Sequence, residues 1–66
     1  MYDYVVHIYV NGLTDDGIIF DVQDNVDDAI EVAELAYEET GELFTVTPLD
    51  PATNTYQATV YVVGAQ

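Results

Sequence analysis

The sequence predicts an α+β fold of order ββαββ, in which a four-stranded, mainly antiparallel sheet carries one helix on one face. Three observations lead to this fold class. Apolar residues alternate over residues 2–10 and recur at helical spacing over residues 26–40, and turn-forming Asn, Gly and Pro residues separate these segments. The chain has 66 residues, half of them hydrophobic, which is the size of a single domain spanning residues 1–66.

Two strands are expected before the helix. Residues 2–10 alternate between the two faces of a strand. The side chains expected to face the core are those of Tyr2, Tyr4, Val6, Ile8 and Val10. The side chains expected to point outward are those of Asp3, Val5, His7 and Tyr9. Asn11-Gly12 and Asp16-Gly17 favour turns because Asn, Asp and Gly tolerate positive φ. Residues 18–22 then form a second strand, with Ile18, Phe20 and Val22 on one face, and complete a hairpin.

The helix is expected from Val26 to Thr40. Asn25 is a suitable N-cap, and Asp27 and Asp28 place negative charge in the first turn, where the helix dipole favours it. Gly41 fits the left-handed position that follows a helix. One apolar stripe is predicted along the helix, formed by Val26, Ala29, Ile30, Ala33 and Tyr37.

Two more strands are expected after the helix, at residues 42–47 and 56–63, with Pro48, Pro51 and Asn54 in the loop between them. Tyr56 and Val62 are placed on the core side of the last strand together with Ala58 and Val60. Short connections around the helix make the second and third strands parallel in direction, and the longer first and last strands are expected in the middle of the sheet.

One helix covers one face of such a sheet, so the other face is a second region of interest. The alternation assigns to it an apolar and aromatic set, namely Val5, His7, Tyr9, Ile19, Thr45, Thr59, Tyr61 and Val63. Two interpretations stay open: an ordinary half-covered sheet, or a face that binds a partner or a second copy of the chain. In the second case His7, Tyr9 and Tyr61 are the candidate contact residues.

The charge is one-sided. The chain has 13 Asp and Glu and no Lys or Arg, which gives a formal net charge of −13. Such a charge destabilises the compact state by self-repulsion, and solubility alone requires a net charge of only about 2 to 8.

Four helix acids form one continuous row on a helical wheel, along one flank of the apolar stripe: Asp27, Glu31, Glu34 and Glu38. The row spans about 16 Å at ~1.5 Å per residue. The row contains three neighbouring pairs of like charge, and each pair costs about 0.2–0.5 kcal/mol of helix stability at low salt. A solvated helix face, adaptation to high salt and a surface that meets a basic partner all remain as explanations. For the last, the loop acids Asp15, Asp16, Asp21 and Asp24 are further candidates.

The residue inventory argues against several function classes. There is no Cys, Ser or Lys, and His7 is the single histidine, so we expect no catalytic residues, no metal site and no cofactor. Direct binding of nucleic acid is not expected, because phosphate contacts need Lys or Arg. No segment has the length of a membrane span or the pattern of a signal peptide, so a cytoplasmic protein without membrane contact is expected.

In size and composition the whole chain resembles the phage- and virus-encoded DNA-mimic inhibitors, which include acidic anti-CRISPR proteins, anti-restriction proteins and uracil-DNA glycosylase inhibitors. The resemblance implies an inhibitor that occupies the DNA-binding channel of a basic nucleic-acid-binding protein, in the host cytoplasm if the protein is viral. Two alternatives remain. One is a small salt-adapted structural or regulatory protein, and the other is an antitoxin-like module, because residues 24–30 are similar to the helix entry of small HicB-type antitoxins.

Overall fold

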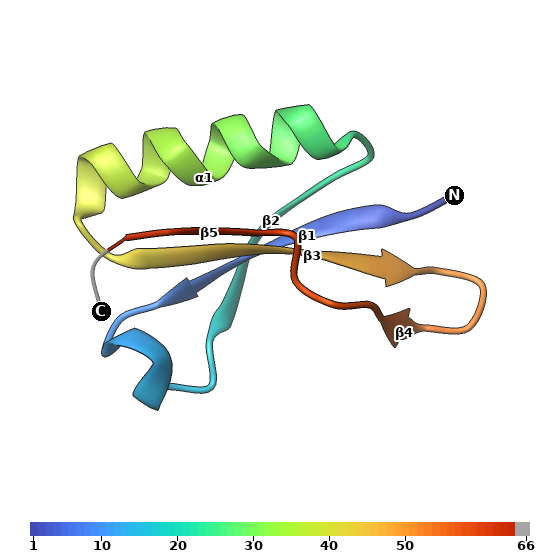
Figure 1. The fold of residues 1–66 in the computed structure, drawn as a ribbon, viewed down its shortest axis with the longest axis horizontal. Helices are drawn as coiled ribbons and strands as arrows, with labels where there is room; N and C mark the ends of the chain where they lie inside the picture. The colour runs from blue at the N-terminus through green and yellow to red at the C-terminus, as the bar shows by residue number, and fades with distance from the viewer. Residues whose placement is uncertain (65–66) are drawn as a thin grey trace.

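The computed structural model describes residues 1–64 and has the α+β fold expected from the sequence, with one α-helix on a mainly antiparallel sheet (Figure 1). The last expected strand is divided in two. The elements in chain order are β1 (Asp3–Tyr9), the 3-10 turn η1 (Gly12–Thr14), β2 (Ile18–Gln23), α1 (Val26–Thr40), β3 (Leu43–Asp50), β4 (Thr55–Tyr56) and β5 (Tyr61–Val63).

The sheet has the strand order β2-β1-β3-β4, and β5 also pairs with β3. β1 is antiparallel to both β2 and β3, so β2 and β3 run in the same direction, as expected. The expectation that the first and last strands are central is wrong for the last strand. β3 takes that position because it pairs with β1 over seven residues, from Asp3↔Leu49 to Tyr9↔Leu43.

α1 has the bounds that its capping residues predict. Asn25 lies in an extended conformation, and its side-chain oxygen accepts hydrogen bonds from the backbone N–H groups of Asp27 (2.8 Å) and Asp28 (3.2 Å). At the other end Gly41 has φ 73°, and its N–H donates to the carbonyl of Tyr37 at 2.8 Å. A left-handed glycine at this position ends the helix.

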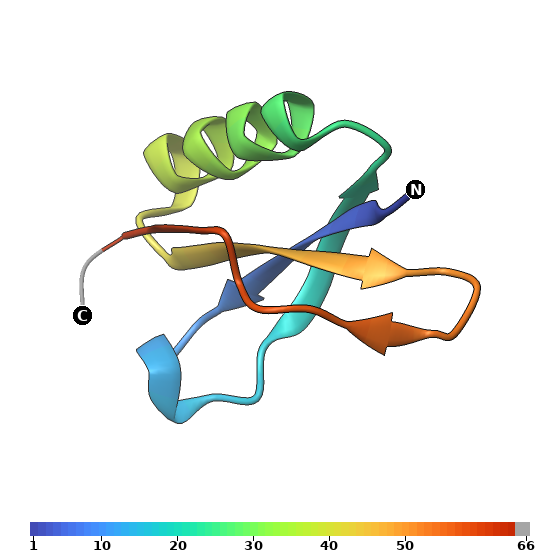
Figure 2. The same cartoon turned by 45° about the vertical axis from the view of Figure 1, so that its right-hand side comes forward.

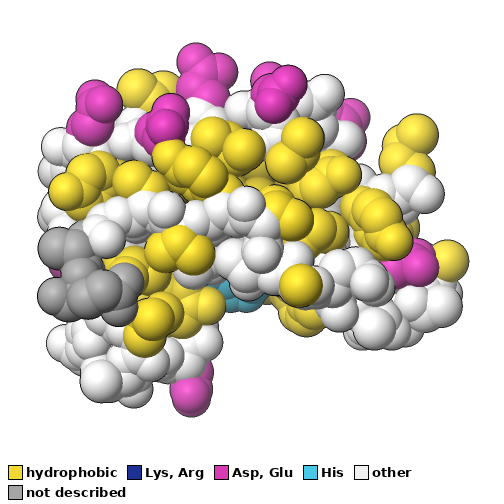
Figure 3. All heavy atoms as spheres, viewed as in Figure 1, with side chains coloured by type: hydrophobic (Ala, Val, Ile, Leu, Met, Phe, Trp, Pro, Cys, Tyr) yellow, Lys and Arg dark blue, Asp and Glu magenta, His cyan; other side chains and the backbone are white. Residues whose placement is uncertain are grey.

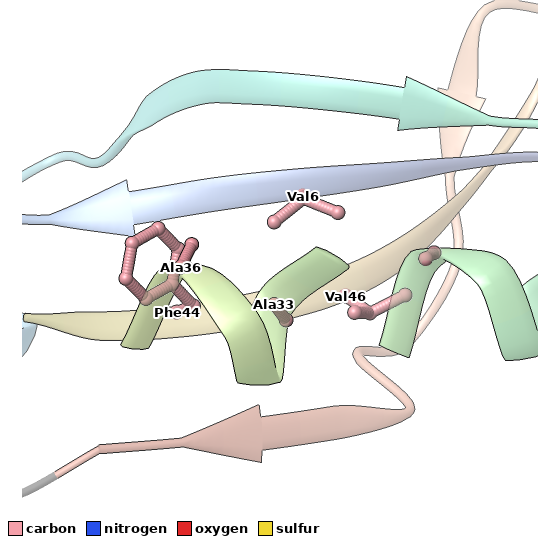
Figure 4. Packing of buried hydrophobic residues seen from close by; sticks show 6 residues of the cluster. Val6, Ala33, Ala36, Phe44 and Val46 are labelled. Carbon is pink, nitrogen blue, oxygen red and sulfur yellow. The ribbon is translucent and has the colours of Figure 1, made fainter. Parts of the chain in front are cut away.

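The core lies between α1 and the two central strands. Ala29, Ala33 and Ala36 are buried on the helix, and they lie over Val6 of β1 and Phe44 and Val46 of β3 (Figure 4). Tyr4, Ile8, Ile30, Tyr37, Tyr61 and Val63 pack around this cluster. The buried side of the helix thus consists of short side chains, whereas Ile30, Val32 and Tyr37 are half-buried and Leu35 is exposed.

The C-terminal half of the sheet departs from the expected strand bounds. β3 continues through Pro48 to Asp50, and the carbonyl of Pro48 still accepts a hydrogen bond from the Gln57 N–H at 2.9 Å. The expected strand 56–63 is interrupted: Leu49 pairs with Tyr56 and Val46 with Tyr61, so five residue steps on one side oppose three on the other. The two extra residues leave the ladder and divide the strand.

The face of the sheet away from α1 is partly covered by the chain itself. η1 and the β3–β4 hairpin lie on this side (Figures 1 and 2). The Thr47 and Thr59 hydroxyls lie 2.9 Å apart in a hydrogen bond. Val5 was expected to point outward and does so, but it is only 1 % exposed. The expectation of a largely uncovered face is therefore wrong at its centre, and the exposed part is confined to its margins.

Candidate functional site

The acidic helix is the most polar surface of the molecule. Six of the fifteen residues of α1 are acidic, and all six are exposed. Figure 3 shows these carboxylates gathered over the helix, along one side of the molecule. No Lys or Arg exists in the chain, so none of these carboxylates can form a salt bridge with such a side chain.

The expected row of Asp27, Glu31, Glu34 and Glu38 is present, and we call it the acidic row. Its orientation differs from the sequence prediction. The buried side of the helix is formed by alanines, whereas Ile30 and Tyr37 of the expected stripe are only half-buried. The buried side is therefore rotated around the helix axis, and the acidic row points outward into solvent instead of following the edge of the buried stripe.

One carboxylate of the acidic row is held in place. The Tyr61 hydroxyl on β5 donates a hydrogen bond of 2.6 Å to Oε2 of Glu34. This bond, together with burial and the negative charge of Glu34, raises the pKa of Tyr61 above its ordinary value. The contact also attaches the middle of the helix to an edge of the sheet.

Of the four acids expected in loops, Asp21 lies within β2, and the other three fall into two groups. Asp24 is exposed and directly precedes the N-cap Asn25, so it lies near the N-terminal end of the acidic row. Asp15 and Asp16 lie between η1 and β2, on the side of the sheet away from α1 (Figure 2). The Asp16 N–H donates to Oδ1 of Asp15 at 2.9 Å. The structure therefore brings Asp24 to the acidic row and places Asp15 and Asp16 elsewhere.

The second candidate surface differs from the expected set along the last strand, where Tyr61 and Val63 have changed sides with Tyr56 and Val62. His7 and Tyr9 lie on the sheet face away from α1, with ring centroids 6.3 Å apart. Tyr61 lies on the helix side instead, where it pairs with Val46 and contacts Glu34. The third aromatic ring on this face is Tyr56, 5.7 Å from His7. Alternation could not decide which face Tyr61 takes, because residues 60–63 are all apolar. Pairing with β3 decides it.

His7 and its cross-strand neighbour Thr45 carry polar atoms without partners. His7 Nδ1 and Thr45 Oγ1 are buried, and neither has a hydrogen-bond partner within residues 1–64. Burial lowers the pKa of His7 below its ordinary value, because a charged imidazole loses hydration there. Figure 3 shows a hollow between the η1 lobe and the β3–β4 hairpin, with the single histidine at its base. It is shallow, and no pocket is found in the part of the chain that the structure describes.

A further surface was missed by the sequence prediction. β2 carries four exposed apolar side chains: Ile18, Ile19, Phe20 and Val22. The sequence prediction placed Ile18, Phe20 and Val22 together on one face of a regular strand. A β-bulge opposite Val6 and His7 disrupts that alternation. The sequence contained one signal of this surface. Ile18, Ile19 and Phe20 are consecutive and apolar, so both faces of this short strand carry apolar side chains.

The other site classes have no structural counterpart among the described residues. Within residues 1–64, no group of three or more His, Cys, Asp or Glu side chains is placed to hold a metal ion. No helix in the same range is long and apolar enough to cross a membrane.

Comparison with known proteins gives no relative from which to infer function. No protein-family model matches the chain, and neither a curated protein nor a solved structure is significantly similar to it. The functional argument therefore rests on the acidic row, the aromatic residues around His7 and the edge strand β2.

Proposed function

We propose that this protein is an inhibitor that binds a basic nucleic-acid-binding protein and blocks the access of DNA by charge mimicry. One observation supports this most strongly. The acidic row is exposed and points outward, and no Lys or Arg anywhere in the chain compensates it. A helix that only needs to be solvated tolerates mixed charges, whereas this one accepts like-charge pairs that cost about 0.2–0.5 kcal/mol each.

The spacing of the charges is compatible with partial mimicry. The four carboxylates of the acidic row span about 16 Å of helix axis, with roughly 5 Å between neighbours. One DNA strand carries a phosphate charge every ~3.4 Å. Asp24 adds one charge at the N-terminal end, whereas Asp15 and Asp16 lie on the other side of the sheet and cannot extend the row. The mimicry is thus limited to about five charges.

CRISPR–Cas effectors and restriction enzymes are the target classes that best fit an inhibitor of this size and charge. Such an inhibitor would be a viral protein and would act in the cytoplasm of the host cell. Electrostatic attraction would make association fast and strongly dependent on salt. The protein would act by occupying a surface, without catalytic residues, cofactor or metal.

The test is a competition experiment with a panel of purified Cas nucleases and restriction endonucleases, in which a fluorescently labelled DNA duplex reports DNA binding by anisotropy. We expect the protein to displace the duplex from at least one target, and raising salt to weaken this effect. A panel in which no enzyme loses DNA binding, or in which protein and duplex bind a target together, would contradict the proposal.

Two matched variants locate the site. Glu31→Lys/Glu38→Lys reverses two charges of the acidic row and leaves the Glu34–Tyr61 hydrogen bond intact. Asp28→Lys/Glu39→Lys reverses two exposed charges about 100° further around the helix. Each reversal adds two units, so both variants carry −9 in place of −13. We expect the first to weaken inhibition at least about tenfold and the second less than about threefold. Equal effects would show that net charge, and not the acidic row, determines binding.

A further inference from the structure

The edge strand β2 offers unpaired backbone hydrogen-bonding groups. In the part of the chain that the structure describes, β2 pairs only with β1, and no other backbone hydrogen bond involves residues 18–23. The opposite edge of the sheet is divided into the short strands β4 and β5. β2 is therefore the one continuous edge of six residues, and such an edge is a template for an additional strand.

The side chains of β2 are unusual for a solvent-exposed edge. Ile18, Ile19, Phe20 and Val22 are 46–61 % exposed. Natural edges are commonly protected by Lys, by Pro or by a covering segment. β2 contains neither residue type, and its protective features are the bulge at Phe20 and the charge of Asp21. The exposed apolar area and the free backbone groups thus occur on the same strand.

Acidic residues lie within and beside this edge. Asp21 lies near the middle of β2 and accepts a hydrogen bond from Gln23 Nε2 at 2.7 Å. Asp16 and Asp24 are exposed just beyond its two ends. A strand that pairs with β2 therefore meets apolar side chains and carboxylates together, which selects for apolar and basic residues in that strand.

The position of Asp21 disfavours a second copy of this chain as the occupant. The midpoint of β2 falls between Phe20 and Asp21, so full-length antiparallel self-pairing brings the two Asp21 side chains within about one residue of each other. Like charges this close across a strand pair are destabilising. The bulge also twists the edge away from a second rigid sheet, whereas an isolated extended segment can follow the twist.

We propose that the β2 edge binds an extended segment of the basic partner protein as an added strand. Its apolar side chains cover Ile19 and Val22, which lie on the side of the sheet away from α1 opposite His7 and Val5, and its Lys or Arg residues face Asp21 on the helix side. This inference rests on the proposed function, because that function defines the partner as a basic protein. It adds a second contact, made mainly through the backbone, to the electrostatic contact of the acidic row.

The probe is a nine-residue peptide of alternating lysine and valine with blocked termini. Amide NMR spectra of the full chain should show shifts and slowed hydrogen exchange concentrated in residues 18–23. The same peptide with alternate backbone amides N-methylated keeps its charge and loses the donors along one edge. We expect it to bind at least about tenfold more weakly. Equal binding of the two peptides, with shifts over α1, would overturn the edge site.

Val22→Lys places a charged, edge-protecting residue on β2 and should weaken binding of the unmodified peptide at least about tenfold. Val62→Lys is the matched control, because Val62 is similarly exposed, lies on the same sheet face and belongs to β5. Circular dichroism verifies that both variants fold. Equal affinities for the two variants would contradict the proposal. Concentration-dependent dimerisation of the parent that Val22→Lys abolishes would assign the edge to a second copy and would also overturn it.

The DNA-competition assay separates this inference from the proposed function. If Glu31→Lys/Glu38→Lys loses inhibition and Val22→Lys keeps it, the inhibitor function holds and the edge site is wrong. If no target is displaced by the parent protein, the proposed function fails, whatever the peptide does. If both variants lose inhibition and both controls retain it, both surfaces contact the target.

Discussion

His7 lies on the central strand β1, and its ring centroid is 6.3 Å from that of Tyr9 and 5.7 Å from that of Tyr56. Its Nδ1 atom is buried and has no hydrogen-bond partner within residues 1–64. Burial lowers the pKa of His7, so the unfolded chain takes up the imidazole proton more readily than the folded one. Above the unfolded pKa of about 6.5, His7 is neutral in both states and its contribution to stability is fully present. This contribution is lost as the pH falls through the lower, folded pKa.

A His7→Phe variant should remove this pH dependence. Phenylalanine keeps a ring beside Tyr9 and Tyr56 and carries no proton. As the pH falls from about 7 to 5, we expect the free energy of unfolding of the parent to decrease relative to that of the variant. Urea titrations of both proteins at each pH measure the difference, in which the contribution of the shared carboxylates cancels to first order. Parallel pH profiles for the two proteins would show that His7 is not held neutral by the fold.

At the scale of the elements, α1 depends on its N-cap. Asn25 satisfies the N–H groups of Asp27 and Asp28, which otherwise have no partner within the helix. Asn25→Ala should cost about 1 kcal/mol, which lowers the melting temperature by roughly 4–8 °C for a domain of this size. Thermal unfolding followed by circular dichroism measures the shift, and Asn25→Ser is the control that retains a capping oxygen. An unchanged melting temperature for Asn25→Ala would show that tertiary packing alone fixes the start of the helix.

The same capping residues explain why the helix could be predicted from the sequence. Asn25 and Gly41 act locally, so their effect is visible in the sequence without knowledge of the fold, and the observed bounds match. The orientation of the helix depended on tertiary contacts. The predicted stripe included Ala29 and Ala33 together with Ile30 and Tyr37, whereas the buried side is formed by Ala29, Ala33 and Ala36.

The strands show where prediction from local sequence fails. The hairpin of β1 and β2 followed from alternation and turn residues. The side assigned to Tyr61 was wrong because residues 60–63 are all apolar, so alternation does not distinguish their two faces. The placement of Pro48 in a loop was also wrong, since β3 continues through it despite the missing N–H. For the candidate site, the members of the acidic row and their exposure followed from helical spacing. The Tyr61–Glu34 hydrogen bond and the free β2 edge depend on strand order, which no local pattern encodes.

At the scale of the whole molecule, thirteen like charges lie on a body of only 32 × 23 × 15 Å. The Debye length is about 30 Å at 0.01 M salt and about 10 Å at 0.1 M. At the lower concentration, charges at opposite ends of the protein still repel each other. At about 0.5 M, only immediate neighbours such as Glu31 and Glu34 interact. Unfolding separates the charges, so their repulsion acts against the folded state.

The fold should therefore become more stable as salt increases from 10 to 500 mM. The three like-charged pairs of the acidic row alone contribute on the order of 1 kcal/mol, which corresponds to a rise of roughly 5 °C in melting temperature. Calorimetry of the parent and of Glu31→Lys/Glu38→Lys measures this. The variant should show a smaller rise, because each of these pairs then joins opposite charges. A flat profile for the parent would contradict the repulsion argument. A requirement for molar salt would instead identify salt adaptation as the reason for the acidic surface, since a binding surface for a basic partner requires a chain that is folded at ordinary salt.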